Sequence, residues 1–310
     1  MSKPAPLTYR TTNWGAYNAA LRQRGSLLVW FDPETEWLAV PRGRRGRPAT
    51  FSDAAIQTCL TLKALFGLPL RQATGLVASL LKLAKLDWPV PDFSTLCRRA
   101  SSLTVKIPYR PSTGALHLLV DSTGIKAMGE GEWSTRKHGV PRPRRWRKVH
   151  LGIDAETLEV RAIEVTGSRV GDGPMLPGLL AQIPPEETIS IVTADGAYDT
   201  RACHSAIAIR QASAVIPTRR NGRPWQETIP GAQARNDILR ATRRLGRSIW
   251  RAWSGYHRRS RIEAKMRCLK LLGERLMART FERQTTELHI RAALLNRFTR
   301  LGTPETIRVA

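Results

Sequence analysis

Three segments near the start of the chain carry apolar residues at helical spacing. Apolar positions recur every three or four residues over 52–66, over 70–86 and over 92–103, which is the spacing of one buried helix face. Ser52 precedes the first segment as an N-cap would, and Gly67 follows it as a C-terminal stop would. The pattern predicts three short helices.

The third predicted helix has a polar outward face. Its residues are Ser94, Thr95, Arg98, Arg99 and Ser102. Three short helices ending in such a helix resemble a helix-turn-helix DNA reader, and an ordinary three-helix bundle is the alternative. We expect Arg98 and Arg99 to contact DNA, and we predict a small all-helical DNA-binding domain over residues 51–110.

From Leu116 onward the pattern changes to that of strands. Short apolar or alternating runs stand at Leu116–Val120, Lys148–Asp154, Glu159–Thr166 and Ile189–Ala194. The middle two are spaced as a hairpin. A helix is expected over Gly173–Ile183, and the chain after Trp225 has a helical pattern to about Arg300. This order of elements predicts a mixed α/β layer structure, which we place at residues 111–310.

The charge of the chain restricts its partners. The 310 residues have a net charge of +25, and 42% of them are hydrophobic. A folded protein this basic is expected to bind a polyanion, with nucleic acid the first candidate and an anionic membrane surface the second. No apolar run reaches the length of a membrane span and the first residues do not form a signal peptide, so we expect a cytoplasmic protein without a membrane partner. The four cysteines are too scattered for a zinc clip or a disulfide framework.

Residues 1–50 are expected to form an N-terminal arm that ends in a basic run. The run contains Arg45-Gly46-Arg47-Pro48. An extended segment of this composition is narrow enough to enter an A·T-rich minor groove, where the negative potential attracts arginine. Arg45 and Arg47 are therefore candidate DNA contacts, and a solvated linker is the alternative.

Two aspartates, Asp121 and Asp195, directly follow apolar strand-like runs. Strand ends are where ligand-binding groups collect in open α/β sheets. Three other acids compete for such a role. Asp154 falls at a hairpin turn and Asp199 at a helix start, so turn and cap roles are the simpler interpretation. Asp172 stands in a loop before a helix and is left open as a neighbour of the site.

Four polar residues near the C-terminus form one stripe on a predicted helix. Tyr256, Arg259, Glu263 and Lys270 fall within about 60° of arc at 100° per residue. If this helix packs against the strand ends, Glu263 joins the two aspartates. Three clustered carboxylates repel one another, and Mg²⁺ or Mn²⁺ would relieve the repulsion. Two such ions about 3.5–4 Å apart are suited to phosphoryl transfer.

Five strings carry a family resemblance. They are Val120-Asp-Ser-Thr-Gly-Ile-Lys126, Trp146-Arg-Lys-Val-His-Leu151, Thr193-Ala-Asp-Gly-Ala-Tyr-Asp199, Ile216-Pro-Thr-Arg-Arg-Asn221 and the Tyr256–Lys270 stripe. The set resembles the DDE transposases of the bacterial insertion-sequence-five family, in its 903-like branch. The resemblance implies a ribonuclease-H-like core, with a mixed five-stranded sheet flanked by helices. The first aspartate would lie on strand one, the second after strand four, and the glutamate on a following helix.

The resemblance also implies the chemistry. The catalytic residues would be the ligands of two Mg²⁺ or Mn²⁺ ions, Asp121, Asp195 and Glu263. Tyr256, Arg259 and Lys270 would hold DNA beside them. Water would cleave the end of the transposon to leave a 3′ hydroxyl, which would then attack target DNA. A homodimer or higher oligomer would pair two double-stranded ends at the bacterial nucleoid.

Other roles and functions are left open by the sequence. Trp146 and Arg147 would stack on an unpaired base or clamp the DNA backbone, and a core role for the tryptophan is an equal alternative. A tyrosine recombinase would use Tyr256 as its nucleophile and would need no metal. A non-catalytic DNA-binding repressor would explain the helix-turn-helix and the charge. Neither function gives a role to Asp121 and Asp195.

Overall fold

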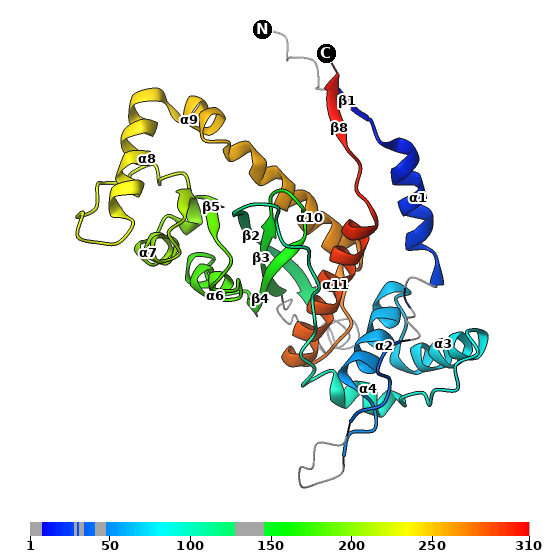
Figure 1. Ribbon diagram of the computed structural model, residues 1–310. Coiled ribbons are helices and arrows are strands. Elements are labelled where there is room, and N and C mark those ends of the chain that lie inside the picture. Colours follow the sequence, from blue (N-terminus) through cyan, green and yellow to red (C-terminus); the bar gives the residue numbers. More distant parts are fainter. Residues whose placement is uncertain (1–7, 28–29, 31–33, 41–47, 128–145, 310) are drawn as a thin grey trace, which may run out of the picture. The chain divides into compact units, whose positions relative to one another are not determined.

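The computed structural model describes residues 8–27, 30, 34–40, 48–127 and 146–309 (Figure 1). Its contacts group the chain into two compact units, Met1–Cys97 with Leu294–Ala310, and Arg98–Ala293. The division at residues 50 and 110 expected from the sequence stays a prediction, because contacts between elements do not define functional domains.

The first unit contains the predicted short helices. They are α2 (Asp53–Leu65), α3 (Leu70–Leu83) and the start of α4 (Phe93–Arg99). The unit also contains α1 (Trp14–Arg24), which the sequence pattern did not predict. Ser52 caps α2 as expected, since its hydroxyl accepts a hydrogen bond from Ala55 N at 3.0 Å. Asp92 caps α4 through Thr95 N at 2.7 Å. Gly67, with a φ of +62°, lets the chain turn between α2 and α3. The three helices form, while their role as a DNA reader remains a prediction.

Both ends of the described chain belong to this unit. β1 (Thr8–Thr11) pairs antiparallel with β8 (Thr306–Val309). Arg24 of α1 donates to the carbonyl oxygens of Phe298 at 3.3 Å and Gly302 at 2.7 Å. Because those carbonyls stand at the end of α11 (Phe281–Leu301), the guanidinium satisfies groups that a helix C-terminus leaves unpaired.

No single described helix has the length and apolar composition to cross a membrane. α2 and α3 meet that criterion only when they are taken together across their bend of 110°.

The second unit is built on a mixed sheet. Its main strands are β2 (Leu116–Ala127), β3 (Trp146–Asp154), β4 (Val160–Gly167), β5 (Ile189–Thr193) and β6 (Ser213–Val215), in the order β4-β3-β2-β5-β6. β3 is antiparallel to β2 and β4, whereas β5 is parallel to β2 and β6. The short β7 (Arg275–Leu276) pairs with the far end of β2. The predicted mixed sheet is confirmed with one added strand, and it agrees with a ribonuclease-H-like fold.

Helices flank this sheet. They are η2 (Gly173–Met175), α6 (Leu176–Ala181), η3 (Gly196–Tyr198), α7 (Arg201–Ile209), α8 (Ala232–Leu245), α9 (Arg247–Trp253), η4 (Tyr256–Arg259), α10 (Ser260–Leu271) and the start of α11. The even-numbered residues Leu116, Leu118 and Val120 of β2 share one apolar cluster with Leu176 of α6 and Ile207 of α7. Since side chains alternate along a strand, the odd-numbered residues of β2 face the other way, toward the side on which α10 lies (Figure 1).

Asp121, the first aspartate predicted to be catalytic, does not end its strand as expected from the sequence. β2 continues through Asp121 to Ala127, because the polar stretch Ser122–Lys126 pairs with β3 over its whole length. Ile125 is buried within that stretch. A polar run that alternates with small and apolar residues can thus extend a strand when a hairpin partner satisfies its backbone.

The predicted helical stretch after Trp225 is also interrupted. Gly246 and Gly255 adopt φ values of +83° and +70° and separate α8, α9 and η4. Tyr256 and Arg259 therefore lie in a 3₁₀ turn, and the rotation of 100° per residue assumed for the stripe applies only from Ser260 onward.

Candidate active site

Asp121 and Asp195 stand at equivalent positions of neighbouring parallel strands. Leu119 of β2 is paired with Thr193 of β5. Asp121 lies two residues further along β2, and Asp195 lies two residues further along the chain, just past the end of β5. Their strands are about 4.8 Å apart. His117 Nε2 lies 2.9 Å from Thr193 Oγ1, so these odd-numbered positions of β2 share a face with Thr193. The register therefore brings both carboxylates to one face of the sheet.

The two aspartates are held differently. Asp121 is within the strand, is only 9% exposed and accepts a hydrogen bond from Ser122 N at 2.8 Å. Asp195 follows the end of β5 and caps η3, where it accepts from Ala197 N at 2.9 Å. One carboxylate is thus fixed by a strand and the other by a helical turn.

Arg259 links the first aspartate to the glutamate. Its Nη2 lies 3.2 Å from Asp121 Oδ2, and its Nη1 donates to Glu263 Oε1 at 2.5 Å. The Arg259 side chain is 17% exposed, whereas that of Glu263 is 58% exposed. A largely buried guanidinium therefore lies between two of the three predicted metal ligands.

The pKa shifts show that the acids act on one another. Burial raises the pKa of Asp121, the Arg259 guanidinium opposes this, and the charges of Asp195 and Glu263 raise it further. Burial works against the charge of Arg259, but Asp121, Tyr256, Glu263 and Asp195 together raise its pKa. The pKa of Tyr256 is raised overall, mainly by burial. The charge of Arg259 acts to lower this pKa, and the charge of Asp195 acts to raise it. The three acids, Tyr256 and Arg259 share one electrostatic environment.

Lys270 is the stripe residue that lies apart. It is seven residues beyond Glu263, in the last turn of α10, which corresponds to a rise of about 10.5 Å. Among the described residues it makes no ion pair with Asp121, Asp195 or Glu263. The five predicted residues Asp121, Asp195, Tyr256, Arg259 and Glu263 thus influence one another electrostatically, and Lys270 lies at the end of the stripe.

Asp172 lies next to this centre, as the sequence left open. Its carboxylate accepts a hydrogen bond from Ser122 Oγ, the residue after Asp121. Lys148 Nζ is 2.8 Å from Asp172 Oδ1, and His150 Nδ1 is 3.6 Å from the same oxygen. Burial raises the pKa of Asp172, but the contacts with Lys148 and Ser122 lower it overall. A compensated carboxylate therefore borders the candidate site.

Tyr198 was not singled out from the sequence. Its side chain is fully buried, and in the described structure its hydroxyl has no hydrogen-bond partner. Burial raises its pKa, and the charges of Asp172, Asp121 and Asp195 raise it further. A buried donor without a partner is costly, so this hydroxyl, on which the charges of three carboxylates act, is suited to bind a water. In the sequence, Gly196-Ala197-Tyr198 is a short string of small and aromatic residues, and it gives no signal that the tyrosine hydroxyl is buried without a partner.

The three predicted metal ligands are not gathered around one point. Within the described ranges, no group of three or more His, Cys, Asp or Glu side chains is placed to hold a metal ion. Arg259 compensates Asp121 and Glu263 instead. The chemistry of the donors nevertheless fits a hard divalent cation, since such ions prefer carboxylate oxygens and Asp121 and Asp195 lie two residues beyond a paired position of β2 and β5.

The predicted DNA contacts are spread over the chain. Arg45 and Arg47 lie outside the described residues, and Arg98 and Arg99 end α4. Trp146 is 38% exposed, above Gly124. Two of these residues already have partners within the second unit, Trp146 beside Lys126 Nζ at 5.8 Å and Arg147 through Gln284 Oε1 at 2.6 Å. Their DNA contacts stay predictions.

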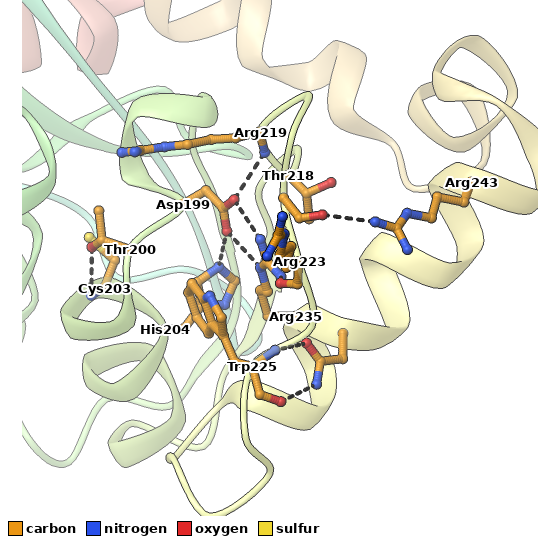
Figure 2. A network of polar contacts seen from close by, with 12 residues as sticks. Asp199, Thr200, Cys203, His204, Thr218, Arg219, Arg223, Trp225, Arg235 and Arg243 are labelled. Carbon is orange, nitrogen blue, oxygen red and sulfur yellow. Dashed lines mark hydrogen bonds and ion pairs between the residues drawn. The ribbon is translucent and has the colours of Figure 1, made fainter.

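Asp199 has a larger structural role than its helix-start position suggested. It is 4% exposed, and its carboxylate accepts from Arg235 Nε and Nη2, both at 3.1 Å, and from Arg219 N at 3.0 Å (Figure 2). Burial opposes its ionisation, but the nearby His204 ring and the hydrogen bonds from Arg235 and Arg219 hold the pKa of Asp199 well below its usual range. The Trp225 ring covers the Arg235 guanidinium at 4.3 Å, which gives this tryptophan a packing role.

Two comparisons with protein families agree with this geometry. A family model described as a transposase DDE domain matches residues 112–297, which is more than half of the chain. A second model with the same description matches residues 22–130.

Proposed function

Because the chain belongs to the transposase DDE domain family, we propose that it moves its own insertion sequence. It binds the terminal inverted repeats, cleaves DNA at the ends in a metal-dependent reaction, and joins the resulting 3′ hydroxyl to target DNA. We assign it to the insertion-sequence-five family, in the 903-like branch. The observation that carries the proposal is the placement of Asp121 and Asp195 at matched positions of β2 and β5, with Arg259 connecting Asp121 to Glu263.

The three acids would hold divalent cations, Mg²⁺ or Mn²⁺, two per site. Such ions supply activation of an attacking oxygen and stabilisation of a leaving oxygen in phosphoryl transfer. The protein's own contribution is to fix the carboxylates. Asp121 is immobilised by a strand, Asp195 by its cap bond to η3, and Glu263 by α10. Asp121 is only 9% exposed, so little bulk water reaches its side chain.

Arg259 is suited to a second role in the same site. A guanidinium can bind two phosphate oxygens side by side, and this one is already charged and largely buried at the carboxylates. It would therefore orient the phosphodiester next to them, with Tyr256 packed alongside. Lys270, about 10 Å further along the helix, would contact the DNA backbone beyond the cut bond.

The proposal also assigns DNA recognition to particular segments of the chain. The helices α2 to α4 would act as a helix-turn-helix reader, with the Arg45–Arg47 arm entering a minor groove. Two or more copies of the chain would pair the two transposon ends, and the protein would act at the nucleoid. The bend between α2 and α3 falls in the range of helix-turn-helix motifs.

A nicking assay tests the proposed function. The substrate is a plasmid that carries the DNA flanking this reading frame on both sides, incubated with Mg²⁺ or with EDTA. We expect nicks at the element ends, with free 3′ hydroxyls, in Mg²⁺ alone. Nicking in EDTA with protein joined to DNA would support a tyrosine recombinase instead. Tight binding without nicking in either condition would support a repressor. The matched aspartates favour neither alternative.

Replacing Arg98 and Arg99 with Ala is expected to weaken binding to the element end about 10-fold or more, since each good base contact is worth about 1–3 kcal/mol. Strand transfer from a pre-cut end should change little, because both residues lie outside the catalytic cluster. Competition binding against unrelated duplex DNA measures the first effect. Equal losses in end binding and in strand transfer would contradict the proposed division of labour between α4 and the sheet.

A further inference from the structure

The segment between Asp195 and Glu263 is strongly basic. Residues 217–261 contain 12 arginines and two acids, Glu227 and Asp237. Ten of these arginines are exposed. One of them, Arg261, donates to the carbonyl oxygen of Ala155, and we call the other nine the arginine surface: Arg219, Arg220, Arg223, Arg240, Arg243, Arg244, Arg247, Arg251 and Arg258. Among the described residues, only Arg240 of this set forms an ion pair, with Asp237.

The loop that carries the first three of these arginines is held by its backbone. Arg235 Nη1 donates to Arg223 O at 2.5 Å, and Asn236 of the same helix bonds both the N and the O of Trp225, at 2.9 and 2.8 Å. Figure 2 shows the Arg219 side chain directed away from the Asp199 carboxylate, which bonds only its backbone N. The buried network thus fixes the loop and leaves its charged side chains outside.

Two arginines of α8 and α9 bind the same loop without losing their charge. Arg243 Nη2 donates to Gly222 O at 2.9 Å, and Arg247 Nη2 donates to Thr218 O at 3.0 Å. A carbonyl oxygen satisfies a donor but does not neutralise a cation. The fold therefore uses arginine to brace the loop and keeps the positive field intact.

The arginine surface reaches the catalytic residues through α9. The Trp250 ring centroid lies 6.0 Å from that of Tyr256, and the Arg251 guanidinium lies 5.5 Å from the Tyr256 ring centroid. Tyr256 in turn shares the electrostatic environment of Asp195 and Arg259. An anion that follows the arginine surface would thus arrive at the candidate active site.

We propose that the arginine surface binds the phosphate backbone of duplex DNA next to the bond that is cut. Clustered like charges repel one another, and a row of phosphates removes that repulsion. The braced loop also reduces the conformational entropy lost on binding. The inference rests on the proposed function only for the identity of the cut bond, since the contact with DNA requires neither metal nor an intact active site.

The salt dependence of DNA binding tests this surface. The variant Arg219→Gln, Arg220→Gln, Arg244→Gln removes three exposed charges. In the described structure these three side chains make no hydrogen bond and no ion pair. The matched control, Arg10→Gln, Arg22→Gln, Arg300→Gln, removes three exposed charges from the first unit, outside the helices assigned to the DNA reader. Each full-length protein is titrated in EDTA with a 30-base-pair duplex of arbitrary sequence at several salt concentrations.

The slope of log affinity against log salt falls by about 0.9 for each phosphate contact that is lost. We expect the arginine-surface variant to lower the slope by about 2–3 and the control to lower it by less than about 1. Equal slopes for the two variants, or no duplex binding by the unmodified protein, would overturn the inference. Because metal is absent, a failed nicking assay would leave this result standing, and a flat slope would leave the nicking assay standing.

Discussion

Replacing Asp121 with Asn is expected to lower Mg²⁺-dependent nicking about 10³-fold or more, with DNA affinity in EDTA unchanged. A carboxylate that ligates catalytic cations contributes several kcal/mol to transition-state stabilisation, and each 1.36 kcal/mol corresponds to about tenfold in rate. The amide keeps the shape of Asp121 and its bond to Ser122 N but removes the charge. Initial nicking rates on the flanking-DNA plasmid provide the measurement.

A control with the same chemical change is available at Asp87. This aspartate is exposed in the segment between α3 and α4, so Asp87→Asn should nick at the unmodified rate. Retention of more than about a tenth of the activity by Asp121→Asn would remove this residue from the catalytic set. Asp195→Asn should behave as Asp121→Asn does, because the strand register gives the two residues matched positions.

The strands of the sheet that carry or precede Asp121 and Asp195 could be predicted from the sequence because each signal was local. An apolar run of five or six residues that ends in an acid indicates a buried strand, and the hairpin between β3 and β4 has alternating apolar positions. Asp154 was also predicted correctly as a turn residue, since it accepts from Glu156 N at 2.8 Å. Local spacing cannot show strand order, and the pairing of β2 with β5 across more than seventy residues needed the structure.

The geometry around Glu263 could be predicted only in part. The stripe places Arg259 and Glu263 on one side, and the two residues do meet at the i, i+4 spacing that helices favour. Gly255, in a left-handed conformation, starts a tighter turn over Tyr256–Arg259, which no periodic pattern signals. The contact between Arg259 and Asp121 joins residues far apart in the chain, so it follows from the packing of α10 on β2.

The Asp199–Arg235 pair had a sequence signal that helix periodicity could reveal. The buried positions of α8 are Ala232, Arg235, Asn236 and Leu239, which follow the spacing of one helix face. An arginine and an asparagine on the apolar face of a helix are expected to have buried partners, because an unpaired polar group there is costly. The helical pattern could not identify the partner, Asp199, because that residue lies on another element.

Replacing Arg235 with Met is expected to lower the free energy of unfolding of the second unit by about 3–5 kcal/mol. Arg235 and Asp199 are 2% and 4% exposed, and removal of one member leaves an uncompensated buried charge. The loop 218–225 would also lose the bond from Arg235 Nη1 to Arg223 O, and the Asp199 carboxylate that accepts from Arg219 N would lose its guanidinium partner. Chemical denaturation followed by circular dichroism provides the measurement.

An exposed ion pair on the same helix supplies the control. Arg240 pairs with Asp237, and both side chains are more than half exposed, so Arg240→Met should change stability by less than about 1 kcal/mol. The double variant Asp199→Leu, Arg235→Met should be more stable than Arg235→Met alone, since it no longer buries a lone carboxylate. If Arg235→Met and Arg240→Met cost the same, the buried pair does not hold the loop. Other contacts would then have to hold the loop of the arginine surface, because Arg235 and Asn236 of α8 make the bonds to its backbone at Arg223 and Trp225.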